Sequence, residues 1–341
     1  MNSSPNVGPD LTGGGASAPR EEGWRQAVAI AVAQPVAGPL FALVVIKAVF
    51  SLTTTTFLNV GNLSLIFQQS VVIGTLALGQ TLIILVAGID LACAAIMVLA
   101  TVVIGSVATE GNVALAFVLG AVACVAVAAI NGIAVTRFRL PPFIATLGML
   151  TIITAGARLY TNSRSYPISS DWLMLMGSGP ASGLVTFSYG SMLWIGLTFL
   201  LSYALTQTAW GTHVYAVGSS PSAARLNGIY VDRVIFSVYA LAGVFYFLAA
   251  WQALGRTPIA DPSGYQAANL DSITAVVIGG SSLFGGRGGV AGTFVGTLIV
   301  TVLKNGLTQA GIDSLYQQIG TGILVILAVG WDQYFRSGRK A

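Results

Sequence analysis

The sequence predicts an all-α, polytopic membrane protein with about ten transmembrane helices. Composition is the first observation, because 55% of the 341 residues are hydrophobic and only 8% are charged. A soluble domain carries roughly 25% charged residues. Too few charges are present to cover a water-exposed surface, so lipid is the expected solvent for most of the chain. The spacing of apolar segments and the placement of basic residues are the other two observations.

Apolar segments approach, one after another, the roughly 20 residues that a helix needs to cross a bilayer. They lie near 27–49, 69–87, 91–109, 113–135, 143–160, 189–206, 234–254, 270–284, 289–309 and 317–334. The third depends on a tight turn from Gly88 to Asp90, and the eighth is the weakest because it is short and begins near Asp271. Together they predict a transmembrane domain over residues 24–335.

The basic residues predict that both ends of the chain are cytoplasmic. Cytoplasmic loops hold an excess of lysine and arginine. With ten spans and an inner N-terminus, ten of the fifteen basic residues fall inside, namely Arg20, Arg25, Arg137, Arg139, Arg225, Arg233, Arg287, Arg336, Arg339 and Lys340. Four others lie near outer helix ends, where long side chains snorkel, and these are Lys47, Arg158, Arg256 and Lys304. The fifteenth, Arg164, is in a predicted outer loop.

The two terminal segments differ from the predicted membrane domain. Residues 1–23 are rich in glycine, proline and serine and contain no apolar run, so they predict a disordered cytoplasmic tail and not a signal peptide. Residues 336–341 predict a short basic cytoplasmic tail.

The glycine-rich stretch at 279–293 offers a competing interpretation. Gly286 and Gly288 fit the start of the G-x-G-x-x-A pattern of a dinucleotide loop. No lysine stands in the G-K-[ST] context of a phosphate loop, and the membrane composition argues against a soluble nucleotide domain. Gly288, Gly292 and Gly296 recur every four residues, which favours close packing of helices or a hinge. We expect neither a nucleotide nor another cofactor.

Metal and enzyme chemistry have no support in the residue pattern. Cys93 and Cys124 lie inside apolar segments and are interpreted as small buried hydrophobes. The single histidine, His213, has no cysteine or second histidine nearby. No metal site and no nucleophile–base set is expected, which argues against a membrane enzyme.

Polar and glycine residues within apolar segments are the candidates for a translocation path or gate. Asp90 stands out because an ionised carboxylate at the bilayer centre costs about 2.5–3.5 kcal/mol on insertion scales. A helix N-cap is the alternative role for Asp90, and a cap is also expected for Asp271. An asparagine in a membrane helix bonds across helices or reaches solute. The candidate set is Gly88, Asp90, Asn131, Thr146, Gly279, Gly280 and Ser282.

The longest predicted inner connection, residues 207–233, contains a predicted short helix. Pro221 suits a first helical turn, and Asn227 followed by Gly228 suits a stop. Small side chains would let this helix enter a groove on another protein. Lying on the lipid surface is the alternative, although that needs a wider apolar face. The candidate contact residues are Pro221, Ala223, Ala224, Arg225, Asn227 and Gly228.

Four blocks of sequence resemble the permease subunits of ribose-type ABC importers for monosaccharides. They are VAGIDLACA (86–94), NGIAVTRFRLPPFIATLGML (131–150), YAVGSSPSAARLNGIYVDR (215–233) and AVVIGGSSLFGGRGGVAGT (275–293), in the order and spacing of that family. The resemblance covers roughly residues 55–335 and is strongest toward fructose-type and ribose-type members. It implies the ABC importer permease fold, a bacterial inner membrane location and no enzymatic activity of the chain itself.

The resemblance also implies partners, namely a second permease chain in a homodimer, a cytoplasmic ABC ATPase, a sugar-binding protein outside, and membrane lipid, with no nucleic acid. It identifies residues 221–229 as the coupling helix that touches the ATPase. Arg164 and Arg256, on predicted outer loops, are expected to dock the sugar-binding protein. One departure concerns residues 92–95, where the family continues with Ser-x-Gly-Ser and this chain has Ala-Cys-Ala-Ala.

Two related functions stay open beside the sugar importer. One is an ABC permease of the branched-chain amino-acid type, which the four blocks fit less well. The other is a secondary sugar carrier that works alone, and this would need intramembrane carboxylates or ion sites, of which the sequence offers few.

Overall fold

The computed structural model describes residues 36–180 and 187–337, and this part of the chain is mainly helical. The helices are α2 (Ala37–Thr53), α3 (Val60–Leu85), α4 (Cys93–Ala108), α5 (Val113–Thr136), α6 (Pro142–Thr161), α7 (Asp171–Met174), the 3-10 turn η1 (Leu175–Gly177), α8 (Tyr189–Gln207), α9 (Ala209–Ser219), α10 (Pro221–Leu226), α11 (Val231–Arg256), α12 (Ala268–Ile278), α13 (Val290–Gln309) and α14 (Ser314–Ser337). The strands β1 (Tyr166–Pro167) and β2 (Ile259–Ala260) pair antiparallel. The predicted tail at 1–23 and residues 338–341 of the predicted basic tail lie outside the described residues.

Six helices of the described part are long and apolar enough to cross a membrane, namely α3, α5, α6, α8, α11 and α13. The shorter apolar helices α2, α4, α12 and α14 occupy the other predicted segments. The prediction of an all-α polytopic membrane protein is therefore confirmed. The eighth segment, 270–284, is wrong as a full span because α12 has only 11 residues. At 1.5 Å per residue it is roughly 16 Å long, about half the thickness of the hydrocarbon core.

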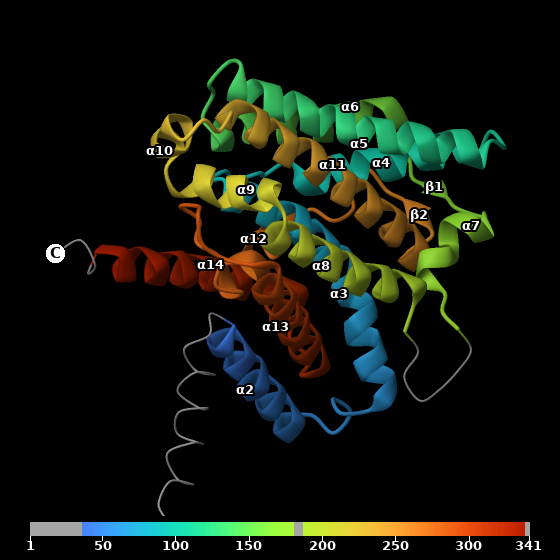
Figure 1. Cartoon of the computed structure of the whole chain (residues 1–341). Helices are drawn as coiled ribbons and strands as arrows, with labels where there is room; N and C mark the ends of the chain where they lie inside the picture. The colour runs from blue at the N-terminus through green and yellow to red at the C-terminus, as the bar shows by residue number, and fades with distance from the viewer. Residues whose placement is uncertain (1–35, 181–186, 338–341) are drawn as a thin grey trace, which may run out of the picture.

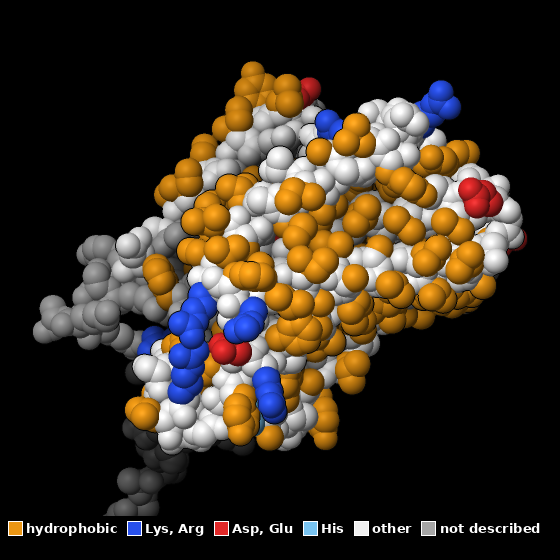
Figure 2. Space-filling model, turned by 90° about the horizontal axis from the view of Figure 1, so that it is seen from above, with side chains coloured by type: hydrophobic (Ala, Val, Ile, Leu, Met, Phe, Trp, Pro, Cys, Tyr) orange, Lys and Arg blue, Asp and Glu red, His pale blue; other side chains and the backbone are white. Residues whose placement is uncertain are grey.

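The helix bundle has two distinct ends (Figure 1). Helix α10, the α5–α6 connection and the C-terminal end of α14 lie at one end, and α7, β1 and β2 lie at the other. The central helix is α3. In its most apolar 18-residue stretch, 83% of the residues are buried, against 22% for α5 and 17% for α6. The face in Figure 2 is largely hydrophobic, while lysine and arginine gather at one end around an acidic side chain.

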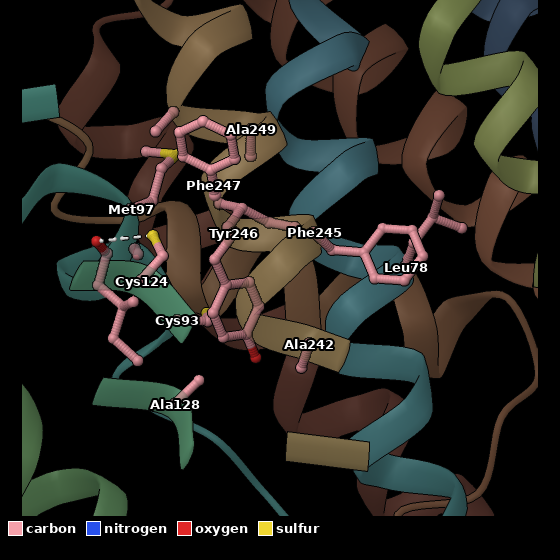
Figure 3. Packing of buried hydrophobic residues seen from close by; sticks show 14 of the residues in the cluster. Leu78, Cys93, Met97, Cys124, Ala128, Ala242, Phe245, Tyr246, Phe247 and Ala249 are labelled. Atoms are coloured by element: carbon pink, nitrogen blue, oxygen red, sulfur yellow. Dashed lines mark hydrogen bonds between the residues drawn. The ribbon is translucent and has the colours of Figure 1, made fainter. Parts of the chain in front are cut away.

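The core forms where α11 packs between α3, α4 and α5. Phe245, Tyr246 and Phe247 are successive buried residues of α11 that point to different neighbours. Figure 3 shows Phe245 facing Leu78 of α3, whereas Phe247 faces Met97 of α4. Because three adjacent side chains reach three directions, the helix is apolar all round, as expected of a helix buried within a membrane protein.

Glycines let α12 and α13 touch backbone to backbone. A Cβ atom on Gly292 would collide with the carbonyl oxygen of Gly279, and one on Gly296 would collide with that of Ala275. The predicted close packing is therefore confirmed for Gly292 and Gly296. Gly288 is different, because it precedes α13 and adopts a φ of 133°, so it serves the turn and not the helix face.

We predict that Gly296→Val destabilises the folded chain, because overpacking costs typically about 1–3 kcal/mol and the added side chain would collide with backbone atoms of Ala275. The measurement is the thermal unfolding midpoint of the purified chain in detergent. Gly196→Val in α8 is the matched control, because a Cβ there meets nothing within 4 Å. Equal midpoints for the two variants would contradict the assignment of Gly296 to a backbone contact.

Candidate translocation site

The helical structure is interrupted between α3 and α4. This interruption, called the break below, lies deep inside the protein. Helix α3 ends at Leu85 and α4 begins at Cys93, so residues 86–92 are not helical. Asp90 in this break is fully buried and contacts Tyr246, which lies near the middle of the 26-residue α11. Non-helical backbone at membrane depth is tolerated only where protein or a water-filled cavity satisfies its polar groups.

Asp90 is held by hydrogen bonds from two directions. The backbone N–H of Ala92 donates to Asp90 Oδ1 at 2.7 Å, and the hydroxyl of Tyr246 donates to Oδ2 at 2.9 Å. The side-chain amide of Gln80 in α3 pairs with the backbone N–H and C=O of Asp90, each at 3.2 Å. The expected N-cap role is wrong, because Ala92 is the N-cap of α4 and Asp90 lies two residues earlier.

Two further side chains fasten the same break. Thr146 of α6 accepts a hydrogen bond from the N–H of Leu91 and donates one to the carbonyl of Ile89, both at 3.1 Å. Asn269 at the start of α12 donates from Nδ2 to the carbonyl of Leu91 at 3.3 Å. Side chains of α3, α6, α11 and α12 therefore converge on one stretch of unpaired backbone.

The predicted path residues fall into three groups in the structure. Gly88, Asp90 and Thr146 belong to the break, and the N–H of Gly88 donates to the carbonyl of Ile83 at 2.8 Å. Gly279, Gly280 and Ser282 belong to the turn after α12, where Gly280 has a φ of 90° and Ser282 donates its N–H to Arg287. Asn131 stands apart on α5, where its buried amide has no hydrogen-bond partner among the described residues.

Sequence reasoning missed Gln80, Tyr246 and Asn269. Each is a polar side chain within or beside an apolar segment, which is the signal that could have found them. Hydropathy alone did not rank them, because a single amide or phenol barely changes the mean over a window of about 19 residues.

A cleft of about 590 Å³ lies beside the break, between α4, α6 and the segment before α12. Its polar wall comprises Thr151, Thr154, Arg158, Gln266 and Asn269, and Ala94, Ala95 and Val98 of α4 line it as well. Ala94 and Ala95 belong to the Ala-Cys-Ala-Ala stretch at 92–95, so this stretch forms part of the wall of the cleft. Asn269 lines the cleft and also binds the break, which connects the two features directly.

The turn between α12 and α13 packs against the other side of the break. The N–H of Gly286 donates to the carbonyl of Leu85 at 2.9 Å. Gly286 also lies against Ser219 at the end of α9, and the hydroxyl of Tyr215 donates to the carbonyl of Gly288 at 2.9 Å. Arg287 is therefore part of a turn that joins α9 to the break.

Helix α10 confirms the short helix expected in the 207–233 connection. Pro221 occupies its first turn, Asn227 is the C-cap, and Gly228 follows with a φ of 80°. Figure 1 places α10 at one end of the bundle, beside α9. The predicted contact residues do not share one face, however, because Ala224 is only 4% exposed and packs into the chain.

The charged residues near α10 pair with each other at the surface. Arg225 binds Asp232 at 3.3 Å, with both side chains more than half exposed. The guanidinium of Arg233 lies 4.6 Å from the ring centre of Tyr230. Arg164 and Arg256 are both exposed at or beyond the C-terminal ends of α6 and α11.

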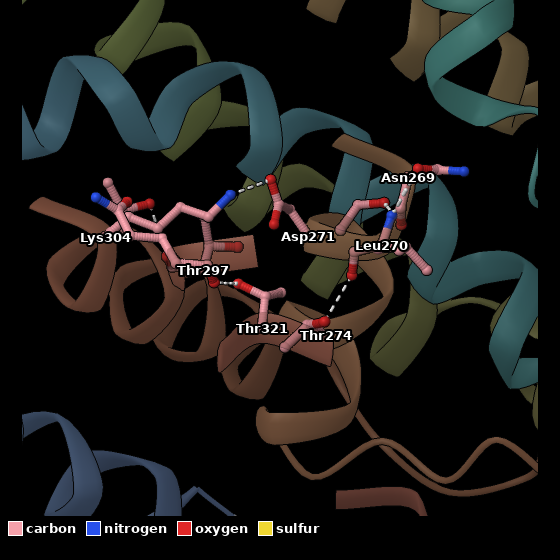
Figure 4. Close-up of polar contacts among 10 residues, drawn as sticks. Asn269, Leu270, Asp271, Thr274, Thr297, Lys304 and Thr321 are labelled. Atoms are coloured by element: carbon pink, nitrogen blue, oxygen red, sulfur yellow. Dashed lines mark hydrogen bonds and ion pairs between the residues drawn. The ribbon is translucent and has the colours of Figure 1, made fainter. Parts of the chain in front are cut away.

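The N-cap role expected for Asp271 is wrong. Ala267 is the N-cap of α12, and Asp271 lies inside the first turn. Lys304 of α13 binds Asp271 Oδ2 at 2.5 Å, and the two side chains are 25% and 6% exposed. Figure 4 shows Lys304 reaching across to Asp271 between the two helices. The ammonium group of Lys304 thus has a counter-charge inside the protein.

The cysteines and acidic residues form no metal site in the described ranges. Cys93 and Cys124 are buried and free, as predicted. Within residues 36–180 and 187–337, no three histidine, cysteine, aspartate or glutamate side chains come together as metal ligands.

Comparison with known proteins defines the class of this protein. A family described as "Branched-chain amino acid transport system / permease component" matches residues 62–329. The fructose import permease protein FrcC of Rhizobium meliloti is 41% identical over 310 residues, which are 89% of this chain and 86% of that protein. The ribose import permease protein RbsC of Escherichia coli K12 is 37% identical over 301 residues, 85% and 91% of the two chains. RbsC of Bacillus subtilis is 34% identical over 305 residues, 87% and 92%.

The chain therefore belongs to this family of transport-system permease components and is a multi-pass membrane protein. The expected membership of the ribose-type permeases is confirmed, because these relatives are sugar import permeases although the family description mentions amino acids. No solved structure matches this chain.

We predict that Tyr246→Phe destabilises the chain, because it leaves Oδ2 of the buried Asp90 without its donor. A hydrogen bond to a charged group is worth about 1.5–3 kcal/mol. The measurement is again the unfolding midpoint in detergent. Tyr203→Phe in α8 is the control, because Tyr203 is 64% exposed. If both variants unfold at the wild-type temperature, the Tyr246–Asp90 bond does not hold the break.

Proposed function

We propose that this chain is the membrane subunit of an ATP-binding-cassette importer and carries a monosaccharide into the cytoplasm. The observation that carries the proposal is the similarity to fructose and ribose import permeases over almost the whole chain. The cleft agrees with that solute class. Sugars bear hydroxyls and no charge, and the residues that line the cleft include Thr151, Thr154, Tyr265, Gln266 and Asn269, which carry hydroxyl or amide groups.

The cleft is proposed as one wall of the solute path. Several hydroxyl and amide groups within the membrane domain are costly to leave against lipid. The cleft therefore faces water or a second copy of the chain. We infer that two copies form a homodimer and that their clefts together enclose the path, as the importer class requires a pair of membrane subunits.

Contacts in the chain supply a route from the ATPase side to the cleft. We infer that α10 docks a cytoplasmic ATPase, because it protrudes at the end where lysine and arginine gather (Figures 1 and 2). Helix α10 follows directly from α9, whose end lies against Gly286. Gly286 binds the carbonyl of Leu85, and the break beyond Leu85 reaches Asn269 in the cleft wall. A displacement of α10 would thus be transmitted through packed backbone and would shift the wall of the cleft.

The same proposal places both chain ends in the cytoplasm. The α10 end carries Arg137, Arg139, Arg225 and Arg233, which agrees with the excess of positive charge on cytoplasmic loops. The end with β1, β2 and α7 then faces outward and receives the sugar-binding protein.

Reconstitution tests the proposed function. The chain is placed in proteoliposomes with its ATPase and binding protein, and uptake of labelled fructose and ribose is measured with and without ATP. Uptake that requires ATP and both partners supports the importer. Uptake by the lone chain without ATP would instead support a secondary carrier, and uptake of branched-chain amino acids would support the amino-acid branch of the family.

We predict that Ala223→Glu and Ala224→Glu fail in different ways, although they are neighbours in α10. Ala223 is exposed, so its glutamate leaves the chain folded but blocks a tight groove on the ATPase. Ala224 is buried, so its glutamate destabilises the chain itself. Co-purification of the ATPase and the unfolding midpoint distinguish the two outcomes. A folded Ala223→Glu variant that retains its ATPase and transports normally would refute the coupling role.

We predict that Arg164→Glu with Arg256→Glu weakens docking of the sugar-binding protein, and more strongly at low salt. Both arginines are exposed at the outward end, where acidic groups on a partner can pair with them. Affinity is measured at two salt concentrations, with Arg137→Glu at the inner end as the control. Affinity that stays the same at low salt would show that these arginines do not contact the partner.

A further inference from the structure

The charge on the wall of the cleft is positive and is not balanced by a negative charge there. Arg158, in the last turn of α6, is the charged side chain among the residues that line it. Two ion pairs occur in the described residues, Arg225 with Asp232 and Lys304 with Asp271, and Arg158 takes part in neither. Its five N–H donors are therefore available to whatever enters the cleft.

The acidic residues near the cleft make hydrogen bonds elsewhere in the protein. Asp261 precedes the lining residue Pro262, and its Oδ1 accepts a hydrogen bond from the N–H of Ser263 at 2.8 Å. Asp90 is fully buried behind the cleft and holds Tyr246. Neither carboxylate lines the cleft, so the positive charge of Arg158 is not neutralised at the wall.

The wall opposite α6 carries a backbone irregularity. Tyr265 lines the cleft with a φ of 55°, a left-handed conformation that bulky residues rarely adopt. Such conformations are strained and gather at ligand-binding positions. Burial raises the pKa of the Tyr265 phenol, and the guanidinium of Arg256 nearby partly offsets that rise. A second positive charge thus lies near the same wall.

We propose that Arg158 is a specificity-determining residue of the cleft, which admits neutral or anionic polyhydroxylated solutes and repels cationic ones such as amino sugars. The inference rests on the proposed role of the cleft as solute path. The guanidinium of Arg158 donates hydrogen bonds to hydroxyl or carboxylate oxygens of the solute. Walls of low dielectric strengthen its field, so a solute ammonium is disfavoured more than it would be in bulk water.

The neighbouring residue Thr154 allows the electrostatic part of this inference to be measured without transport. Thr154 lines the cleft one turn before Arg158, and the native Cys93 and Cys124 are buried. In the Thr154→Cys variant, the new thiol is labelled with an anionic and with a cationic methanethiosulfonate. We expect both to react, because Thr154 is partly exposed. We also expect the anionic-to-cationic rate ratio to exceed that of a free thiol.

Charge removal gives the decisive comparison. Adding Arg158→Gln should lower the anionic-to-cationic rate ratio at position 154 about fivefold or more. Loss of the guanidinium removes an attraction for the anionic reagent and a repulsion of the cationic one, so both rates change the ratio in the same direction. Arg158→Lys keeps the charge and should keep most of the ratio. Arg164→Gln removes a charge that does not line the cleft and is the matched control. An unchanged ratio in Arg158→Gln, or a thiol that reacts with neither reagent, overturns the proposal.

The complete importer tests the consequence for solutes. Uptake of an amino sugar is compared with uptake of its neutral parent sugar, using one binding protein for all variants so that its preference cancels. Arg158→Gln should raise the relative uptake of the amino sugar, and Arg158→Lys should not. An unchanged ratio of uptakes overturns the selectivity claim. Failure of sugar uptake in every variant, with the labelling ratios intact, would count against the proposed function instead.

Discussion

The architecture depends on one constraint. The non-helical backbone at residues 86–92 finds no hydrogen-bond partners in lipid. Its polar groups must find partners inside the protein, or each costs several kcal/mol. The structure meets this need with side chains from four helices, and three of them, Gln80, Thr146 and Asn269, bond directly to the backbone of the break. The packing of α3, α6, α11 and α12 around this point is thus a condition for the break to exist.

The same constraint explains how distant parts of the molecule are joined. The carbonyl of Leu85, at the end of α3, holds Gly286 of the α12–α13 turn, and the carbonyl of Leu91 holds Asn269 in the cleft wall. Glycines at 218, 285 and 286 let the turn and the end of α9 approach so closely that a Cβ atom would not fit. Because packed backbone deforms little, a displacement on one side of the break must be accommodated on the other.

The sequence was sufficient for the class of fold and for part of the site. Composition and apolar spacing predicted the membrane helices, and Asp90 and Thr146 were identified because polar groups are rare in such segments. Tyr246 lies 156 residues from Asp90 and Lys304 lies 33 from Asp271, so neither contact follows from local pattern. The orientation of Ala224 was missed for a similar reason, since a helix of six residues has no periodicity that separates its buried face from its exposed one.

The ion pair between Lys304 and Asp271 is best understood as a positioning contact. A buried pair is seldom a net source of stability, because desolvation offsets the attraction, but a pair that loses one partner leaves a costly charge. Asp271 Oδ1 has no hydrogen-bond partner among the described residues, so the satisfaction of this carboxylate depends on Lys304. The pair therefore holds the first turn of α12 against α13. Asn269 lies two residues before Asp271, so the contact that fixes the half-helix also sets the distance between the cleft wall and the break.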